Sequence, residues 1–431
     1  MTPNSMEPSK EQKEIIESSE KFIQVIAAAG SGKTFTMIRL AEKIFHSKQF
    51  KESEILLITF SRKAAEELRE RLEKAIGSSS IRIHTFHAFC LKMINSFHPD
   101  LKQKIQILTP EEKEEILKEF YKSKRDLIGG IPYELLQSKT NLLSETYFPG
   151  LSGEAEMYYR DFKRENHRLD FDDLVSVFLD GLKKNEAWSL KAKQEIRLII
   201  VDEFQDTDPV QLEWLQLMGP EKLIVVGDDW QAIYGFRGAS TEPFLNFNKI
   251  FTPCKRYFLT ANHRSVSEIV QISAFPIHKN KKNIPKTVVA SRKEKGNVLC
   301  TRIKELRDWQ SLILEVQSRD AVILCRTNYR IRTLIKIGFP ADKIFTIHAS
   351  KGLEYSTVYL DLYGGWTSEE ESDPEEERRI LYVGLSRARD NLFILGPPEL
   401  SSGREQEFYK YFIKKYKDLE FPTFLNESKK N

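Results

Sequence analysis

The sequence predicts the α/β fold class, with two α/β lobes in tandem and a helical insertion in the first lobe. Short, continuous Val/Ile/Leu runs between polar or glycine-containing turns are typical of parallel strands that are buried on both faces. Amphipathic helical patterns separate these runs, as in residues 65–76. This alternation indicates βαβ units. The first series of runs comprises residues 22–27, 55–59, 198–201 and 223–226.

A second series of runs predicts the second lobe. Within the first series, between Cys90 and Asp170, the sequence becomes charged and mostly helical, with helical patterns at 111–124 and 154–164 and a Gly/Pro break at 129–132, which predicts the helical insertion. The second series comprises residues 256–259, 321–325, 344–347, 358–362 and 392–395. The predicted domains are a first lobe at 1–90 and 170–254, the insertion at 91–169, a second lobe at 255–398 and a helical tail at 399–431.

Two features near the C-terminal end have simpler interpretations. The acidic run at 368–377 predicts a solvated loop and a helix start. Residues 405–419 predict a helix whose apolar stripe is more typical of a docking face than of a functional one. The stripe consists of Phe408, Phe412, Tyr416 and Leu419.

Composition sets broad limits on function. With 431 residues and 40% hydrophobic content, the chain can bury substantial cores, and its length favours two or three domains. Lys and Arg number 66 against 63 acidic residues, so the net charge of +3 neither demands nor excludes a polyanionic partner, and any nucleic-acid surface must be local. No run approaches the roughly 18 apolar residues of a membrane helix, and no signal peptide is evident, so no membrane association is expected.

The cysteines argue against a zinc site. They are far apart, with no C-x-x-C pair and no His/Cys cluster at zinc spacing. This pattern predicts a reduced, cytoplasmic setting. The four residues are Cys90, Cys254, Cys300 and Cys325.

A glycine-rich turn between the first predicted strand and the helix predicted at 35–45 has the form of a phosphate-binding loop. Glycines let backbone N–H groups close on phosphate oxygens, Lys33 adds a positive charge, and the Thr34 hydroxyl can hold Mg²⁺. Ala27 departs from the general pattern, which has its first glycine there, so a fortuitous Gly-Lys-Thr is the alternative. The predicted loop consists of Ala28, Ala29, Gly30, Ser31, Gly32, Lys33 and Thr34.

Two carboxylates follow the run at 198–201. Asp202 and Glu203 are expected at the carboxyl edge of a parallel sheet, where ligand sites of α/β proteins are found. Asp202 suits a metal ion, and Glu203 suits the activation of water. The strand could merely be turning into solvent, but the sequence Asp-Glu-Phe-Gln-Asp keeps four polar side chains in five positions, which favours a functional site.

The motifs resemble those of UvrD-like helicases, the UvrD/Rep/PcrA group of superfamily 1. Residues 199–207, IIVDEFQDT, and 225–239, VVGDDWQAIYGFRGA, resemble the second and third signature motifs of this family. The other family motifs occur in order between residues 11 and 389. They are ITFSRKAA at 58–65, TFHAFC at 85–90, DFDDL at 170–174, ANHRS at 261–265, IHASKGLEY at 347–355 and RRILYVGLSRA at 378–388.

The resemblance implies two tandem RecA-like P-loop NTPase lobes with ATP and Mg²⁺ in the cleft between them. It implies that Gln12 hydrogen-bonds adenine and that Glu354 binds the ribose, although both side chains could simply be solvated or ion-paired. His263 stands where the family usually has a tyrosine stacked on adenine, which leaves stacking possible but puts nucleotide selectivity in doubt.

The catalytic residues implied by the resemblance come from both lobes. Glu203 is the base, and Gln231 senses the γ-phosphate. Arg264 and Arg387 reach across from the second lobe, where the fixed fork of a guanidinium matches phosphate oxygens. Each arginine taken alone could instead form a surface ion pair.

The resemblance also implies a surface for single-stranded DNA. Aromatic side chains can stack on bases while hydroxyl and basic groups hold the backbone. Trp230 stands where the relatives commonly have aspartate, and the sequence does not explain this difference. The implied stacking residues are Phe60, Tyr234 and Phe236, and the implied phosphate or base contacts are Thr59, Arg62, His87 and Arg237.

The expected function is an ATP-driven 3′–5′ translocase or helicase on single-stranded DNA. Only about twenty residues separate Arg326 from Ile347, so the large second-lobe insertion of the big relatives is expected to be absent, and little sequence follows Arg389 for a nuclease module. The alternatives are a motor subunit of a multi-protein machine, such as the UvrD-like partner of a Gabija-type phage-defence nuclease, and a nucleic-acid-gated ATPase switch. A P-loop kinase or transferase is poorly supported.

Overall fold

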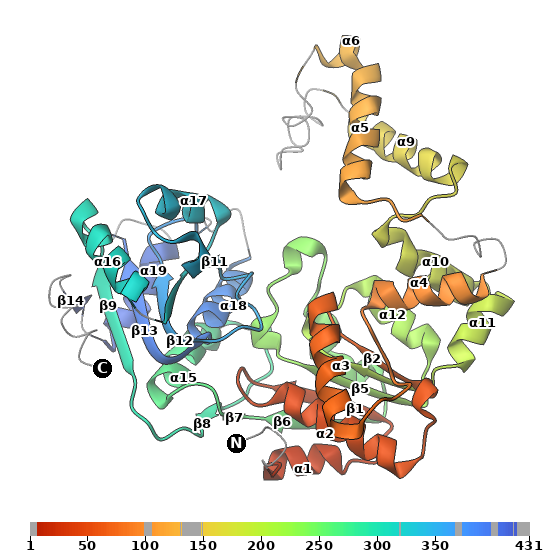
Figure 1. Ribbon diagram of the computed structural model, residues 1–431, viewed down its shortest axis with the longest axis horizontal. Helices are drawn as coiled ribbons and strands as arrows, with labels where there is room; N and C mark the ends of the chain where they lie inside the picture. Colours follow the sequence, from red (N-terminus) through yellow and green to blue (C-terminus); the bar gives the residue numbers. More distant parts are fainter. Residues whose placement is uncertain are drawn as a thin grey trace. The chain divides into compact units, whose positions relative to one another are not determined.

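The computed structural model describes residues 7–98, 106–129, 131, 148, 150–318, 320–366, 373–397, 404–416 and 418–419 (Figure 1). The internal contacts divide the chain into two compact units. One unit contains both large sheets. The other comprises His84–Ile196 and Glu213–Gly219 and consists mainly of helices.

The first sheet has six strands in the order β3-β2-β4-β5-β1-β6. Its central strands are short apolar runs, and every residue of β2 and β4 is buried, as expected for strands covered on both faces. The pairs of β1 with β5 and β6, and of β4 with β2 and β5, are parallel. The strands are β1 Phe22–Ala27, β2 Ile55–Ile58, β3 Arg82–His84, β4 Leu198–Val201, β5 Lys222–Gly227 and β6 Cys254–Leu259.

The position of β6 corrects one prediction. The run at 256–259 was assigned to the second lobe, but β6 pairs in parallel with β1 and completes the first sheet. The chain therefore leaves the first sheet at Leu259, and the residues that follow begin beside the end of β1.

Two amphipathic helices supply much of the first core. Met37 and Leu40 of α2 and Leu68 and Leu72 of α3 pack with the buried side chains of the first sheet. Ser61 caps α3 by accepting a hydrogen bond from the backbone of Ala64. The remaining helices of this part are short. The bounds are α1 Lys10–Ile16, α2 Lys33–Ser47, α3 Arg62–Ile76, α12 Pro209–Met218, α13 Glu242–Leu245 and α14 Phe247–Ile250.

The second sheet also has six strands, in the order β11-β10-β12-β13-β9-β14, and its pairs are parallel. The predicted second series is confirmed in four of its five runs, whereas β9 and β14 were not predicted. The strands are β9 Asn297–Arg302, β10 Ala321–Cys325, β11 Ile344–Thr346, β12 Tyr355–Asp361, β13 Ala388–Gly396 and β14 Asp418–Leu419, and the small pair is β7 Ala261–Asn262 and β8 Val289–Ala290. The helices are α15 Ser267–Ala274, α16 Leu306–Ser318, α17 Asn328–Lys336, α18 Pro374–Leu385 and α19 Arg404–Ile413.

The C-terminal segment differs from its prediction. The helix predicted through residue 419 ends at Ile413, and Leu419 instead lies in β14, paired with Thr301 of β9. Phe408 and Phe412 are fully buried, which agrees with a docking stripe. Residues 368–372 of the acidic run, 130 and 132 of the Gly/Pro break and 420–431 of the predicted tail lie outside the described residues.

The helical unit has its own core. The helices predicted at 111–124 and 154–164 are present as α5 and α9, and Ile116 and Phe120 of α5 pack with Ala155 and Tyr159 of α9. Capping boxes begin α5 at Thr109 and α10 at Asp170. The helices are α4 Phe86–Phe97, α5 Pro110–Ser123, α6 Arg125–Ile128, α9 Leu151–Glu165, α10 Phe171–Lys183 and α11 Ala187–Gln194.

Among the described residues, no helix combines the length and the apolar character that crossing a bilayer requires.

Candidate active site

Two glycines with left-handed backbones shape the turn between β1 and α2. Gly30 has φ +69° and Gly32 has φ +81°. A Cβ atom at Gly30 would lie 2.7 Å from Cβ of Arg264, and one at Gly32 would lie 2.9 Å from Nε2 of Gln12. In the described part of the chain no side chain caps α2, which begins at Lys33. The turn is therefore closely packed, and it presents a helix N-terminus of the kind that binds phosphate.

The carboxyl end of β4 brings acidic groups to this turn. Nζ of Lys33 lies 3.0 Å from Oε1 of Glu203. Burial lowers the pKa of Lys33, but the negative charges of Glu203, Asp202 and Asp228 outweigh it, so this pKa stands above its ordinary value. Glu203 has φ +51°, which is uncommon for a residue with a Cβ atom. The loop lysine and the predicted base thus form one ion pair, with the base on a strained backbone.

The pKa values of the two adjacent carboxylates, Asp202 and Glu203, are shifted in opposite directions. Burial and the charge of Glu203 raise the pKa of Asp202. Burial also raises the pKa of Glu203, but the charges of Lys33 and Lys351 outweigh this and leave it below its ordinary value. Glu203 is therefore held ionised by its cations, whereas Asp202 lacks a comparable partner among the described residues.

The donors available at this edge fit Mg²⁺. Thr34 and Asp202 offer a hydroxyl and a carboxylate oxygen, the hard ligands that this ion prefers, and a divalent cation would offset the charge that raises the pKa of Asp202. Among the described residues, no group of three or more His, Cys, Asp or Glu side chains could hold a metal by itself.

Gln205, which the sequence reasoning did not single out, links the two acidic loops. Its Nε2 donates to Oε2 of Glu203 at 2.6 Å, and its Oε1 accepts from the backbone N–H of Asp228 at 2.9 Å. The side chain is 1% exposed. The signal was present in the polar sequence after β4, where a glutamine between acidic residues has to find partners for both ends of its amide once it is buried.

Gln231 and Arg387 meet beside Asp228. Nε2 of Gln231 donates to Oδ2 of Asp228 at 2.6 Å, and Oε1 of Gln231 accepts from Nη2 of Arg387 at 3.2 Å. Burial, together with the nearby charge of Arg264, lowers the pKa of Arg387 to about 9. Arg387 follows α18 of the second lobe, so the structure brings one predicted arginine into contact with the predicted γ-phosphate sensor.

The second predicted arginine also lies at the phosphate loop. Besides its packing against Gly30, the Nε of Arg264 donates to Oε2 of Glu354 at 2.6 Å, and its Nη1 donates to the carbonyl of Ser386. The carboxylate predicted to bind ribose is thus paired with the arginine predicted to bind phosphate. Their separate roles stay predictions.

The residues predicted to surround adenine lie on both sides of the loop. Gln12, the last residue of a capping box with Ser9, is 6% exposed and donates from Nε2 to the carbonyl of Ser31 at 3.5 Å. The backbone N–H of His263 donates to the carbonyl of Gly30, and its side chain is exposed. An exposed ring beside the loop is compatible with stacking, which stays a prediction.

Four ring side chains form a row, which we call the aromatic row: Phe60, Tyr234, Phe236 and His348. Phe60 stacks on Tyr234 with centroids 5.0 Å apart and ring planes 14° apart, and Phe236 lies 6.0 Å from Tyr234. Phe236 is 65% exposed, so its ring face is open to a base. His348 was not predicted. It lies edge-on to Phe236 at 5.4 Å, and burial, with the nearby charge of Arg326, lowers its pKa to about 4.

The other residues predicted to contact nucleic acid differ from one another in burial and in position. The Thr59 hydroxyl is buried and donates to the carbonyl of Ser61, so it supports the start of α3. Arg62 is exposed in the first turn of that helix. His87 belongs to the helical unit, where its ring lies edge-on to Phe171. The side chain of Arg237 lies outside what the structure describes.

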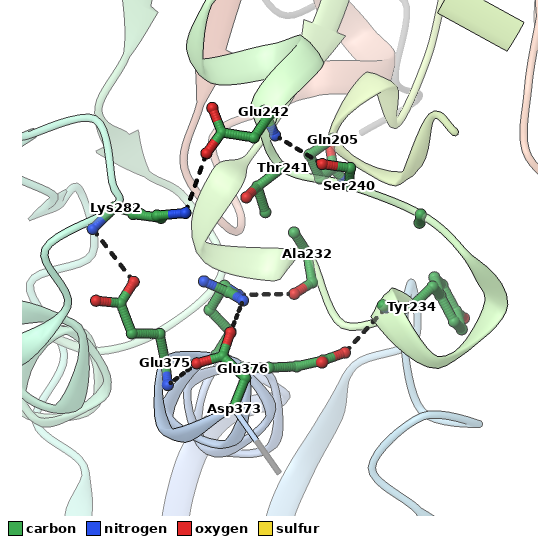
Figure 2. Close-up of a pocket in the computed structure, with 13 residues that line it drawn as sticks. Gln205, Ala232, Tyr234, Ser240, Thr241, Glu242, Lys282, Asp373, Glu375 and Glu376 are labelled. Atoms are coloured by element: carbon green, nitrogen blue, oxygen red, sulfur yellow. Dashed lines mark hydrogen bonds and ion pairs between the residues drawn. The ribbon is translucent and has the colours of Figure 1, made fainter. Parts of the chain in front are cut away.

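A cavity of about 210 Å³ lies beside the aromatic row (Figure 2). On one side, Glu376 of α18 accepts a hydrogen bond from the backbone N–H of Gly235 at 2.9 Å, and Nε of Arg379 donates to the carbonyl of Ala232 at 2.9 Å. Figure 2 shows the side chain of Glu376 reaching from α18 toward this segment. The first turns of α18 therefore hold the loop that carries Tyr234 and Phe236, and Arg387 follows the same helix at its other end.

The exposed ring of Phe236 gives a test of stacking. We expect Phe236→Ala to weaken binding of single-stranded DNA by about 1–3 kcal/mol per base while leaving the salt dependence of binding nearly unchanged, because no charge is removed. Arg237→Ala should instead flatten the salt dependence. The measurement is fluorescence anisotropy over a range of salt concentrations, with Tyr329→Ala as an exposed aromatic control. Unchanged affinity in Phe236→Ala would mean that its ring does not stack on bases.

The fold and the site together define a protein with two tandem RecA-like lobes. It has two six-stranded sheets, a turn of the phosphate-binding kind after the first strand, and two second-lobe arginines, of which Arg264 packs against that turn and Arg387 contacts Gln231. Residues 8–252 match the UvrD/REP helicase N-terminal domain, and residues 336–396 match the UvrD-like helicase C-terminal domain. The chain belongs to the UvrD-like helicase family.

Its curated relatives carry helicase names. A probable DNA helicase II homolog of Mycoplasma capricolum is 30% identical over 352 residues, which cover 76% of this chain and 47% of the relative. The ATP-dependent DNA helicase PcrA of Staphylococcus aureus is 27% identical over 365 residues, 78% of this chain and 50% of the relative. A probable DNA helicase of Mycoplasma pneumoniae is 26% identical over 455 residues, which cover 90% of this chain and 83% of the relative. The chain thus spans about half the length of the first two relatives.

Proposed function

We propose that the chain is an ATP-dependent translocase on single-stranded DNA that moves 3′ to 5′, with ATP and Mg²⁺ held between the two sheets. The direction comes from the family resemblance. The proposal is supported most by one observation: the predicted catalytic groups and the aromatic row are joined through Gln231 and its neighbours.

The connection runs through one lysine. Nζ of Lys351 donates to the backbone carbonyl of Gln231 at 3.0 Å, pairs with Asp206, and lies 4.7 Å from the ring centroid of Tyr234. The side chain of Gln231 contacts Asp228 and Arg387. A movement of Gln231 on hydrolysis would therefore be transmitted to Tyr234 in the aromatic row through Lys351, which contacts both residues.

Each catalytic group has a step suited to its chemistry. Lys33 and the N-terminus of α2 bind the phosphates, and Thr34 and Asp202 would hold Mg²⁺, which would supply charge neutralisation. Glu203, kept ionised by Lys33 and Lys351, accepts a proton from the attacking water. Gln231 orients groups at the γ-phosphate, and Arg264 and Arg387 stabilise charge that develops on its oxygens.

The direct test is the ATPase rate of the purified chain with and without single-stranded DNA. We expect hydrolysis that DNA stimulates, and movement along the strand in a streptavidin-displacement assay with biotin placed at either end. Displacement only from the 5′ end would agree with 3′–5′ movement. An ATPase that ignores DNA would contradict the proposed coupling.

A second candidate is a DNA-gated ATPase subunit of a multi-protein nuclease or phage-defence complex, with little unwinding of its own. One observation favours it: residues 326–343 between β10 and β11 hold only α17 and a short 3₁₀ turn, so no second-lobe domain is inserted there. Unwinding must overcome duplex stacking of about 1.4 kcal/mol per base-pair step, and this chain has less surface for that work.

Duplex length separates the two candidates. We expect the chain to displace a short duplex with a 3′ tail and to fail on a long one, while it translocates on the tail alone. Efficient unwinding of the long duplex would show that the chain is a complete helicase. Pulldown from a native extract would then identify or exclude a protein partner.

A further inference from the structure

A buried lysine in the segment between α15 and β8 has no part in the site described so far. The side chain of Lys286 has no exposed area, although its backbone reaches the surface. Its Nζ lies 2.8 Å from Oδ1 of Asp228 and 2.6 Å from Oδ1 of Asp229. A charge taken wholly out of water is costly unless it is paired, so the lysine and the two carboxylates depend on one another.

Trp230, the residue that departs from the family pattern, completes this cluster. Nζ of Lys286 lies 4.3 Å from the centroid of its ring, within the range of a cation–π contact. The same ring packs edge-on against Tyr382 with centroids 5.5 Å apart, and the Tyr382 hydroxyl accepts from the backbone N–H of Ala29 at 3.4 Å. The tryptophan therefore covers the ammonium group and packs it toward the phosphate loop.

The two carboxylates have different second partners. Oδ2 of Asp229 accepts from the backbone N–H of Ile284 at 2.7 Å, so Asp229 anchors the segment that carries Lys286. Oδ2 of Asp228 instead accepts from Nε2 of Gln231. Lys286 and the backbone N–H of Trp230 thus hold one oxygen of Asp228, while the other oxygen accepts from the Gln231 amide.

The Gln231 amide is fixed at both ends. Its nitrogen donates to Asp228, and its oxygen accepts from Arg387, so a rotation of the Asp228 carboxylate would break the first contact and disturb the second. We propose that Lys286 is a positioning residue for ATP hydrolysis: it fixes the Asp228 carboxylate, which in turn orients Gln231 toward the γ-phosphate and Arg387. This inference rests on the proposed ATPase function.

The first test is Lys286→Met, which keeps the length of the side chain and removes its charge. A displaced catalytic group of this kind costs roughly a hundredfold in rate, so we expect that loss in kcat, with little change in KM for ATP. Lys286→Arg should recover part of the rate, because a cation can again reach Asp228. Lys281→Met, an exposed lysine of the same segment, is the matched control and should leave the kinetics unchanged.

Two double variants separate positioning from mere support of the fold. In a Gln231→Ala background, Lys286→Met should lower kcat no further, because both changes remove the same contact. Lys286→Met combined with Asp229→Asn removes one of the two carboxylate charges left unpaired, so it should fold more readily than Lys286→Met while kcat stays low. Return of kcat in that variant, or additive losses in the Gln231→Ala background, would overturn the positioning role. Wild-type kcat in Lys286→Met would also overturn it. Absence of ATP hydrolysis by the unaltered chain would overturn the proposed function first.

Discussion

Glu203→Gln is expected to lower kcat for ATP hydrolysis by roughly a hundredfold to ten-thousandfold while ATP still binds. The substitution keeps the size of the side chain and its contact with Gln205, but an amide cannot accept the proton of the attacking water. Loss of the ion pair with Lys33 leaves that lysine free to bind phosphate. The measurements are single-turnover hydrolysis and equilibrium binding of a fluorescent ATP analogue.

Two further variants serve as comparisons for Glu203→Gln. Lys33→Ala should weaken nucleotide binding itself, because it removes a positive charge at the phosphate loop. Glu14→Gln, an exposed glutamate of α1, should behave as the unaltered chain. Turnover near normal in Glu203→Gln would exclude Glu203 as the base and direct attention to Asp206 on the same loop.

Arg387→Ala should lower kcat by roughly a thousandfold or more, the usual value of an arginine that stabilises charge in phosphoryl transfer. The guanidinium is fully buried and contacts Gln231, so its loss removes a cation and also frees one end of the sensor amide. Affinity for single-stranded DNA without nucleotide should change little, because Arg387 lies outside the aromatic row. Arg264→Ala should lower kcat in the same direction.

Burial of Arg387 makes a control for folding essential. Thermal unfolding should accompany the kinetics, and Arg387→Lys should keep the fold while losing the forked contact, so kcat should remain low. Arg332→Ala, an exposed arginine of α17, is the matched second-lobe control. If DNA binding and hydrolysis fall together in Arg387→Ala, the residue belongs to the nucleic-acid surface rather than to the ATP site.

The sequence predicts most of the two sheets because their central strands are continuous apolar runs. β4, with all four residues buried, is readable without any knowledge of its neighbours. β6 was assigned to the wrong sheet because sequence periodicity identifies a strand but not its partner. Its residues are mostly exposed or half-buried, as suits an edge strand. Its pairing with β1 joins two segments that are far apart in the sequence, which a local pattern does not reveal.

The site residues also fall into those that a local sequence pattern identifies and those that only their neighbours in space identify. Lys33, Glu203, Gln231 and Arg387 stand in recognisable motifs, and the structure pairs Lys33 with Glu203 and Gln231 with Arg387. Gln205 and His348 also lie within motifs but reveal their importance only through their neighbours in space. Lys286 has no local signal at all, because its partners lie more than fifty residues earlier in the chain.

The pairing of β6 with β1 also bears on how the protein is made. Gln24 of β1 and Arg256 of β6 share a hydrogen bond of 2.8 Å across a separation of 232 residues. At a synthesis rate of about 5–20 residues per second, the first sheet waits tens of seconds for its last strand after β1 has left the ribosome. During that interval one edge of β1 has no strand to pair with, and an unpaired edge invites association with other chains. Completion of the phosphate-binding lobe therefore follows well after synthesis of its signature loop, because β6 lies far beyond β1 in the sequence.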